Sequence, residues 1–425
     1  MDTDGYLNRA KHSTMDAERN CMKKSERSGA FDHIFATTVK EQIGKAGYGD
    51  WRTISAPDAV SLGYGFPYPE SLPEDDLIEA TETVLTDEDE QVLQYGGGSY
   101  TEQLETFLAD RAHSRGIDCG TSNVLVTNGG TRAIDTICRA FLEPGDSMFV
   151  EGPTFMGAIS VFRNHGVELT SIGVDADGLD IDALAETLRL REQQGRDSPK
   201  LLYTIPTFQN PTGVSLSMDR RKRLLELAEE YDFVIIEDDA YGDLRYTEHD
   251  LPPLKALDDT GRVVHIGTFS KTIAPGVRTG WIIATEEILA VLRKLSAGGT
   301  NTFTRSLVAH YCTSGKLAAN IDAIRRAYGE RKDRMQQSLE THMPPTAEWT
   351  EPTGGFFVWV TLPAQIDTEE MLVDAAENGV TYLPGSMFFP EDTGNNSLRL
   401  SFSYVSPDEI DRGIAALGQT VREWT

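Results

Sequence analysis

The sequence of 425 residues is poor in basic residues and cysteines and has no long apolar run. It contains 39 Lys and Arg against 67 Asp and Glu, which gives a formal net charge of −28. A surface of this sign repels nucleic acid and anionic membranes, so we expect neither as a partner. No stretch of about 18 consecutive apolar residues occurs, and residues 1–20 lack the apolar core of a signal peptide. We therefore expect a soluble, cytoplasmic protein.

The cysteines and histidines are too scattered to indicate a metal site. Four cysteines form no CxxC pair, and eight histidines include no HExxH motif. We expect no metal. The acidic excess is spread along the chain, as in DEDE at 87–90 and EPGD at 143–146, which is typical of a solvated acidic coat. We hypothesise an adaptation to high internal salt; a merely acidic enzyme is the alternative.

Short apolar segments alternate with helix-like segments from about residue 120 onward. Strand-like segments are expected at 123–127, 147–150, 201–205, 233–236, 263–266 and 281–284. Continuous apolar strands separated by helices predict an α/β fold with a mostly parallel sheet covered by helices on both faces. The last third predicts a smaller α+β domain, with strands at 356–360, 380–383 and 398–402 and helices at 368–378 and 407–417.

Polar residues follow several of the predicted strands. In chain order they are Asn128-Gly129-Gly130-Thr131, then Gln209–Gly213, then Glu237–Tyr241, and finally Thr268, Ser270, Lys271 and Arg278. Ligands of open α/β sheets bind beyond the carboxyl ends of the strands. We therefore expect these loops to meet at one edge of the sheet and to form one site.

The residue types in these loops suit a phosphorylated aldehyde cofactor. Gly130 and Thr131 at a helix N-terminus can bind a phosphate, and Arg278 can complete that anion site. Partial burial and Arg278 should lower the pKa of Lys271, as a nucleophilic amine requires. A carboxylate after the neighbouring strand, such as Asp238, would keep a ring nitrogen protonated. These needs are those of pyridoxal phosphate.

Two other kinds of phosphate-binding site do not fit the sequence. A Walker A loop needs glycine immediately before its lysine, and Ser270 stands there instead. A dinucleotide site needs GxGxxG after the first strand, which this sequence lacks. We therefore reject a nucleoside triphosphatase and a Rossmann-type enzyme.

The motifs QNPTG (209–213), EDDAY (237–241), TFSKTIAPGVRTGW (268–281) and LRLSF (398–402) occur in an order that resembles one known family. They are similar to those of the fold-type I pyridoxal-phosphate aminotransferases of class I/II, above all the 2-aminoadipate and kynurenine aminotransferase branch. LQYGGGSYTEQL (93–104) and TNGGTRAID (127–135) fit the same pattern, and the likeness covers roughly residues 50–420.

The resemblance implies catalytic roles for three residues. Lys271 corresponds to the lysine that forms the Schiff base and moves the proton. Asp238 corresponds to the partner of the ring nitrogen; the residues alone leave Glu237, Asp238 and Asp239 open. Tyr241 corresponds, with Asn210, to the pair that hydrogen-bonds the 3′ oxygen of the cofactor.

The resemblance also implies the remaining contacts. The phosphate would be bound by Gly130, Thr131, Thr268, Ser270 and Arg278. Phe155 would stack on the ring, where most relatives have Tyr. Tyr95 would reach the phosphate of a neighbouring subunit. Arg399 would bind the α-carboxylate of the substrate, and Asn210 would also contribute to substrate binding. Gly96–Ser99 form a shorter loop than relatives usually have, which leaves the substrate open.

The family implies an aspartate-aminotransferase-like fold and a homodimer with shared sites. We expect residues 1–30 to be loose, 31–90 to form an N-terminal arm and part of the small domain, 91–305 to form the large domain that binds pyridoxal phosphate, and 306–425 to form the small C-terminal domain. The expected activity is transfer of an amino group from an amino acid to a 2-oxo acid by a ping-pong mechanism. A lyase or decarboxylase on the same fold, or an aminotransferase-like regulator, are the alternatives.

Overall fold

The computed structural model of the protein describes residues 33–36, 38, 58–87, 92–96, 98–248, 250–296 and 299–425. The chain divides into two compact units, Met1–Ala46 and Gly47–Thr425. In the first unit, the described residues 33–36 are exposed. The segment 1–30, expected to be loose, lies outside the described residues. No helix within the described ranges is long and apolar enough to cross a membrane. The features below belong to the second unit.

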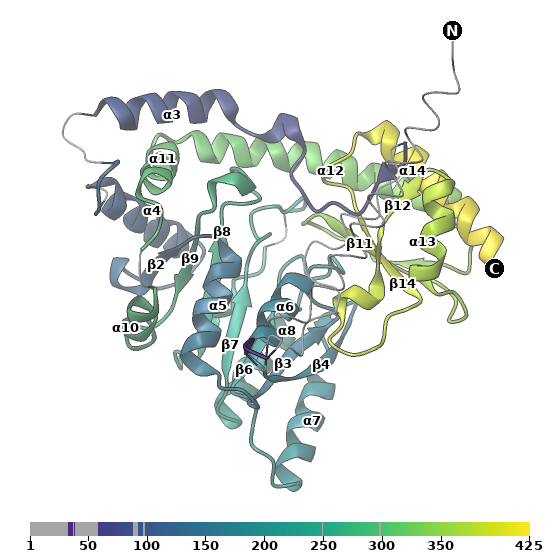
Figure 1. The fold of residues 1–425 in the computed structure, drawn as a ribbon, viewed down its shortest axis with the longest axis horizontal. Helices are drawn as coiled ribbons and strands as arrows, with labels where there is room; N and C mark the ends of the chain where they lie inside the picture. Colours follow the sequence, from purple (N-terminus) through teal and green to yellow (C-terminus); the bar gives the residue numbers. More distant parts are fainter. Residues whose placement is uncertain are drawn as a thin grey trace. The chain divides into compact units, whose positions relative to one another are not determined.

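Within the described residues, the second unit is built on a sheet of eight strands in the order β2-β9-β8-β7-β6-β3-β4-β5 (Figure 1). The strands are β2 (Val124–Thr127), β3 (Ser147–Gly152), β4 (Glu168–Asp175), β5 (Gly178–Leu179), β6 (Leu201–Thr204), β7 (Val234–Asp238), β8 (Val263–Thr268) and β9 (Gly280–Ile283). Neighbours from β4 to β8 are parallel, whereas β9 is antiparallel to both β2 and β8. Most of these strands are buried on both faces, which explains their continuous apolar runs.

Helices cover both faces of this sheet (Figure 1). One face packs against α5 (Gly130–Phe141), α6 (Met156–Asn164) and α10 (Glu286–Leu295). The other packs against α7 (Ile181–Gln193), α8 (Met218–Glu230) and α9 (Leu254–Leu257). Next to β2 and β9 that second face is covered by α3 (Glu74–Thr86), α4 (Tyr100–Ser114) and α11 (Thr302–Thr313).

The last third forms a smaller sheet with its own helices. Its antiparallel strands, in spatial order, are β10 (Glu348–Trp349), β11 (Phe357–Thr361), β14 (Ser397–Ser401) and β13 (Leu383–Pro384). The long α12 (Lys316–His342), α13 (Thr368–Glu377) and α14 (Pro407–Trp424) pack around it in one apolar core. Short 3-10 helices are η2 (Pro69–Ser71), η3 (Thr121–Asn123), η4 (Pro275–Val277) and η5 (Gly385–Phe388).

The expectation of one continuous strand at 380–383 is wrong. The chain forms β12 (Val380–Thr381), which pairs in parallel with β1 (Val60–Ser61), and then β13 in the four-stranded sheet. Tyr382 lies between them with its side chain buried, and its hydroxyl donates to the Thr368 carbonyl at 2.8 Å. The segment is therefore divided into two short strands, because its first half pairs with β1, which is distant in the sequence, and its second half pairs with β14. The broader prediction, a mostly parallel sheet covered by helices and a smaller α+β part, is confirmed.

Candidate active site

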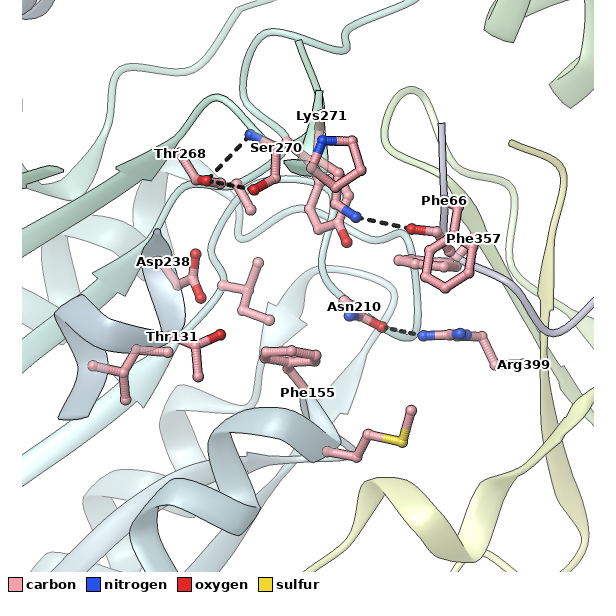
Figure 2. Close-up of a pocket in the computed structure, with 18 of the residues that line it drawn as sticks. Phe66, Thr131, Phe155, Asn210, Asp238, Thr268, Ser270, Lys271, Phe357 and Arg399 are labelled. Atoms are coloured by element: carbon pink, nitrogen blue, oxygen red, sulfur yellow. Dashed lines mark hydrogen bonds between the residues drawn. The ribbon is translucent and has the colours of Figure 1, made fainter. Parts of the chain in front are cut away.

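A cavity of about 190 Å³ lies at the carboxyl ends of β6, β7 and β8, facing the smaller sheet (Figure 2). The structure brings all but one of the expected site residues into its lining: Gly130, Thr131, Phe155, Asn210, Asp238, Tyr241, Thr268, Ser270, Lys271, Arg278 and Arg399. The exception is Tyr95, whose side chain is 98% exposed and lies outside the lining.

Lys271 lies just beyond the end of β8 and points across the cavity (Figure 2). Its Nζ donates to the Gly65 carbonyl at 2.8 Å and lies 5.5 Å from the centre of the Phe356 ring. Burial, followed by the positive charges of Arg399 and Arg278, lowers the pKa of Lys271 to about 8. A larger share of this amine is therefore neutral near pH 7 than of an exposed lysine.

The sheet itself distinguishes the three consecutive acidic residues at the end of β7. Asp238 is buried and lines the cavity. Because side chains alternate along a strand, Glu237 and Asp239 lie on the opposite face. There Glu237 contacts His265 Nδ1 at 2.9 Å, and Asp239 forms an ion pair with Arg115. Burial raises the pKa of Asp238 to about 6.

One end of the cavity carries hydrogen-bond donors suited to an anion. Helix α5 begins at Gly130, directly after Gly129 with φ +89°. A Cβ at Gly129 would lie 2.3 Å from Nη2 of Arg278, so only glycine lets the guanidinium approach this turn. The hydroxyls of Thr268 and Ser270 are 2.9 Å apart at the same end (Figure 2).

The opposite end of the cavity is organised by Arg399 on β14. Its Nη1 donates to the side-chain oxygen of Asn210 at 3.0 Å, and its Nη2 donates to the Gly63 carbonyl at 2.7 Å. The guanidinium lies over the Phe357 ring, 4.1 Å from its centre. Phe155 lies between this end and the anion end (Figure 2). The cavity can therefore hold an anionic group at one end and a second group beside Arg399 at the other.

Two buried polar residues that no sequence motif marks, Glu151 and Arg221, help to hold the loop that carries Asn210. The side-chain amide of Gln209 donates to Glu151 Oε2 at 3.0 Å, and its oxygen accepts from the Thr212 backbone at 2.9 Å. Arg221, which is fully buried, donates to the Leu216 carbonyl at 2.9 Å and also to the Pro206 carbonyl. No local motif marks Glu151 or Arg221, because their partners come from other elements.

Comparison with known proteins agrees with this geometry. The family profile described as "Aminotransferase class I and II" matches residues 58–417. The chain belongs to this family. The enzyme is thus a pyridoxal-phosphate-dependent aminotransferase, and it has the aspartate-aminotransferase-like fold.

Three relatives from Archaea illustrate the likeness. The aminotransferase is 41% identical over 379 residues to aromatic-amino-acid aminotransferase 1 of Thermococcus litoralis, covering 88% of this chain and 90% of that protein. The multiple substrate aminotransferase of Thermococcus profundus has a TM-score of 0.87 at 39% identity over 93% of this chain and 98% of that chain. A Pyrococcus horikoshii kynurenine aminotransferase in complex with PMP has a TM-score of 0.87 at 37% identity over the same shares, 93% and 98%.

The side chains in the cavity of this aminotransferase fit pyridoxal phosphate. The group needs an anion site, a carboxylate for its ring nitrogen and an amine for its aldehyde. Arg278, close to the glycine turn, would supply the anion site, and the buried Asp238 would supply the carboxylate. Lys271, with its lowered pKa, would supply the amine.

Proposed function

We propose that this aminotransferase takes the amino group of an aromatic or large apolar amino acid and passes it to a 2-oxo acid in a ping-pong cycle. Two observations support this substrate class. Phe66, Met156 and Phe357 line the same cavity as Arg399. The Thermococcus litoralis relative is an aromatic-amino-acid aminotransferase. The single observation that carries the proposal is the meeting of Lys271, Asp238 and Arg399 in one cavity.

Lys271 is the group that holds and moves the proton. Bound pyridoxal phosphate supplies an aldehyde for the amino group and a ring that stabilises negative charge at the substrate α-carbon. The neutral amine of Lys271 can accept the proton from that carbon and return it at the next stage. The buried carboxylate of Asp238 would pair with the ring nitrogen of the bound group and would favour its protonated form.

The remaining side chains bind and orient. Backbone and hydroxyl donors, together with Arg278, would bind the phosphate at the anion end; they belong to Gly130, Thr131, Thr268 and Ser270. Phe155 would stack on the ring. Asn210 and Tyr241 would hydrogen-bond the 3′ oxygen of the ring. Because Asn210 also accepts from Arg399, it connects cofactor binding with substrate binding.

Arg399 binds the substrate α-carboxylate. Its planar guanidinium is held by Asn210, the Gly63 carbonyl and the Phe357 ring, so its orientation is set before the substrate arrives. A bidentate pair with a carboxylate needs such a planar donor. The substrate side chain then lies toward the aromatic residues of the cavity.

A homodimer would complete the site. Tyr95 is 98% exposed, and exposed apolar side chains occur near it in the sequence, at Ile78 (65%), Leu85 (48%) and Leu93 (78%). In a dimer, Tyr95 would reach the phosphate site of the other subunit. Sedimentation analysis tests this, and a monomer at assay concentration would contradict it.

The domain boundaries, the cytoplasmic location and the adaptation to salt stay predictions.

An absorbance titration tests the function. Purified enzyme loaded with pyridoxal phosphate should lose its visible band on addition of phenylalanine, tyrosine or kynurenine and regain it with a 2-oxo acid. Aspartate should bleach the band more slowly. Borohydride should fix the cofactor on Lys271. Lys271→Ala should still bind cofactor but lose at least about a thousandfold in turnover, the scale of acid–base plus covalent catalysis. Full activity of that variant would refute the role of Lys271.

A further inference from the structure

Behind Asp238 lies a buried tyrosine that does not line the cavity. Tyr203 on β6 is 0% exposed, and its hydroxyl donates to Oδ2 of Asp238 at 2.7 Å. Its ring packs edge-on against Phe162, with the ring centres 5.3 Å apart. The tyrosine therefore contacts Asp238 from the apolar core between the large sheet and α6, whereas Asp238 itself lines the cavity.

The register of the sheet makes this contact possible. Tyr203 pairs with Ile236 on the neighbouring strand β7. Residues two apart on a strand share a face, so Asp238 lies on the same side of the sheet as Ile236 and Tyr203. The tyrosine side chain spans this diagonal, as its hydrogen bond of 2.7 Å to Asp238 shows. Glu237 and Asp239 point to the other face and cannot take this bond.

The hydroxyl acts on a carboxylate that has no cation bound to it among the described residues. Burial raises the pKa of Asp238 to about 6, and the hydrogen bond from Tyr203 is the largest effect that opposes this rise. A backbone hydrogen bond from Ala240 adds to that opposition. The other ionisable groups that influence Asp238, or are influenced by it, are Glu151, Asp239, His265 and Lys271.

We propose that Tyr203 is a positioning residue that keeps the Asp238 carboxylate ionised and turned toward the ring nitrogen of the cofactor. This inference rests on the role proposed above for Asp238. A hydrogen bond to a buried charged group is stronger than one between neutral groups, and its loss is enough to change the charge of a buried carboxyl whose pKa is already raised. Without the hydroxyl, the proton shared by Asp238 and the ring would move toward Asp238.

Tyr203→Phe tests the proposal with a spectroscopic readout. A less positive ring makes the Lys271 nitrogen more basic once it is bound to the cofactor. The pH midpoint of the visible absorbance should therefore rise by about half a unit or more. Turnover should fall about tenfold at pH 7, with less than a twofold change in the KM of the amino acid, because Arg399 is untouched.

The chain offers a matched control. Tyr382→Phe also removes one buried hydroxyl with a hydrogen bond of similar length, 2.8 Å to the Thr368 carbonyl, but Tyr382 neither lines the cavity nor contacts Asp238 through that hydroxyl. It should lower the melting temperature to a similar degree and leave the absorbance midpoint unchanged. Tyr203→Leu, which also lacks the hydroxyl, should repeat the shift, so the outcome does not depend on one variant folding.

The possible failures can be told apart. If borohydride does not fix cofactor on Lys271 of the wild-type enzyme, the roles proposed for the site are wrong. If the wild-type enzyme is loaded normally and both Tyr203 variants keep its absorbance midpoint and turnover, the role of Tyr203 is wrong. An equal midpoint shift in Tyr382→Phe would also overturn it, because the shift would then reflect general loss of packing.

Discussion

Arg399 donates a hydrogen bond of 3.0 Å to the side-chain oxygen of Asn210, and thereby joins the smaller sheet to the loop after β6. Asn210 stands in the QNPTG motif, and Arg399 in the LRLSF motif. Both side chains are more than nine-tenths buried. The substrate end of the cavity is therefore preorganised by a contact between distant parts of the chain.

Replacing Arg399 by lysine should separate substrate binding from cofactor binding. Lysine keeps the charge but loses the planar pair of donors, so kcat/KM for amino acids should fall about a hundredfold. The affinity for pyridoxal phosphate should change less than threefold. Steady-state kinetics and absorbance titration measure the two effects. Arg189→Lys, at an exposed pair with Glu186, is the control; a loss of the same size there would contradict the role of Arg399.

Uptake of pyridoxal phosphate by cofactor-free enzyme should depend on the protonation of Lys271. With a pKa of about 8, the amine is charged below that pH and neutral above it. The uptake rate should thus rise about tenfold per pH unit from pH 6.5 and level off above pH 8. Stopped-flow absorbance follows it. Arg399→Met removes a neighbouring positive charge and should move the midpoint upward; a rate that falls with pH would contradict the assignment.

Gly129→Ala should weaken cofactor binding through Arg278. A Cβ at Gly129 would lie 2.3 Å from the guanidinium and displace it from the anion end. The dissociation constant for pyridoxal phosphate should rise about 10- to 100-fold, which equals the loss of a charge-assisted hydrogen bond. Gly145→Ala is the matched control, because Gly145 has a similar φ of +91° but open space around its Cβ position. Equal losses in the two variants would show that backbone strain alone is responsible.

Glu151 should make the cofactor-free protein less stable at pH 8 than at pH 5.5. Burial raises the pKa of Glu151 to about 7, so the folded state holds this proton more tightly than the unfolded state. The free energy of unfolding therefore falls as pH rises from about 4.5 to 7, by at most about 3 kcal/mol. Asp238, whose pKa is also raised, acts in the same direction.

Glu151→Gln removes one of these two titrating groups and should flatten the pH dependence of the melting temperature. Glu186→Gln is the control, because Glu186 is exposed and Arg189 lowers its pKa. An unchanged slope in Glu151→Gln would mean that Glu151 is ionised throughout this range.

Molar potassium chloride should raise the melting temperature if the acidic coat is an adaptation to salt. The net charge of −28 makes the folded surface repel itself at low ionic strength. Salt at about 1 M shortens the screening length to roughly 3 Å and removes most of that repulsion. Scanning calorimetry at low and high salt decides the matter; destabilisation by salt would contradict the hypothesis.

Most of the large sheet could be predicted because its strands are continuous apolar runs that end in distinctive loops. The division of the segment at 380–383 could not be predicted, because its first half pairs with β1 and its second half with β14, and both partners are distant in the sequence. The antiparallel direction of β9 was not predicted, because β9 is buried on both faces and is therefore a continuous apolar run like the parallel strands β6, β7 and β8. Helix α14 extends to Trp424, beyond the expected end at residue 417, because its buried face continues to Val421.

Residue order and composition were sufficient to determine the family, the cofactor and the acidic character of this aminotransferase. These properties depend on local motifs and on the summed charge, and both can be read from the sequence without knowledge of the fold. The choice of Asp238 over Glu237 and Asp239 required either the family pattern or the sheet, whose alternating faces turn only Asp238 toward the cavity. The support from Tyr203 and the Arg399–Asn210 bond were decided by the tertiary structure alone, because buried polar pairs form between strands that meet only on folding.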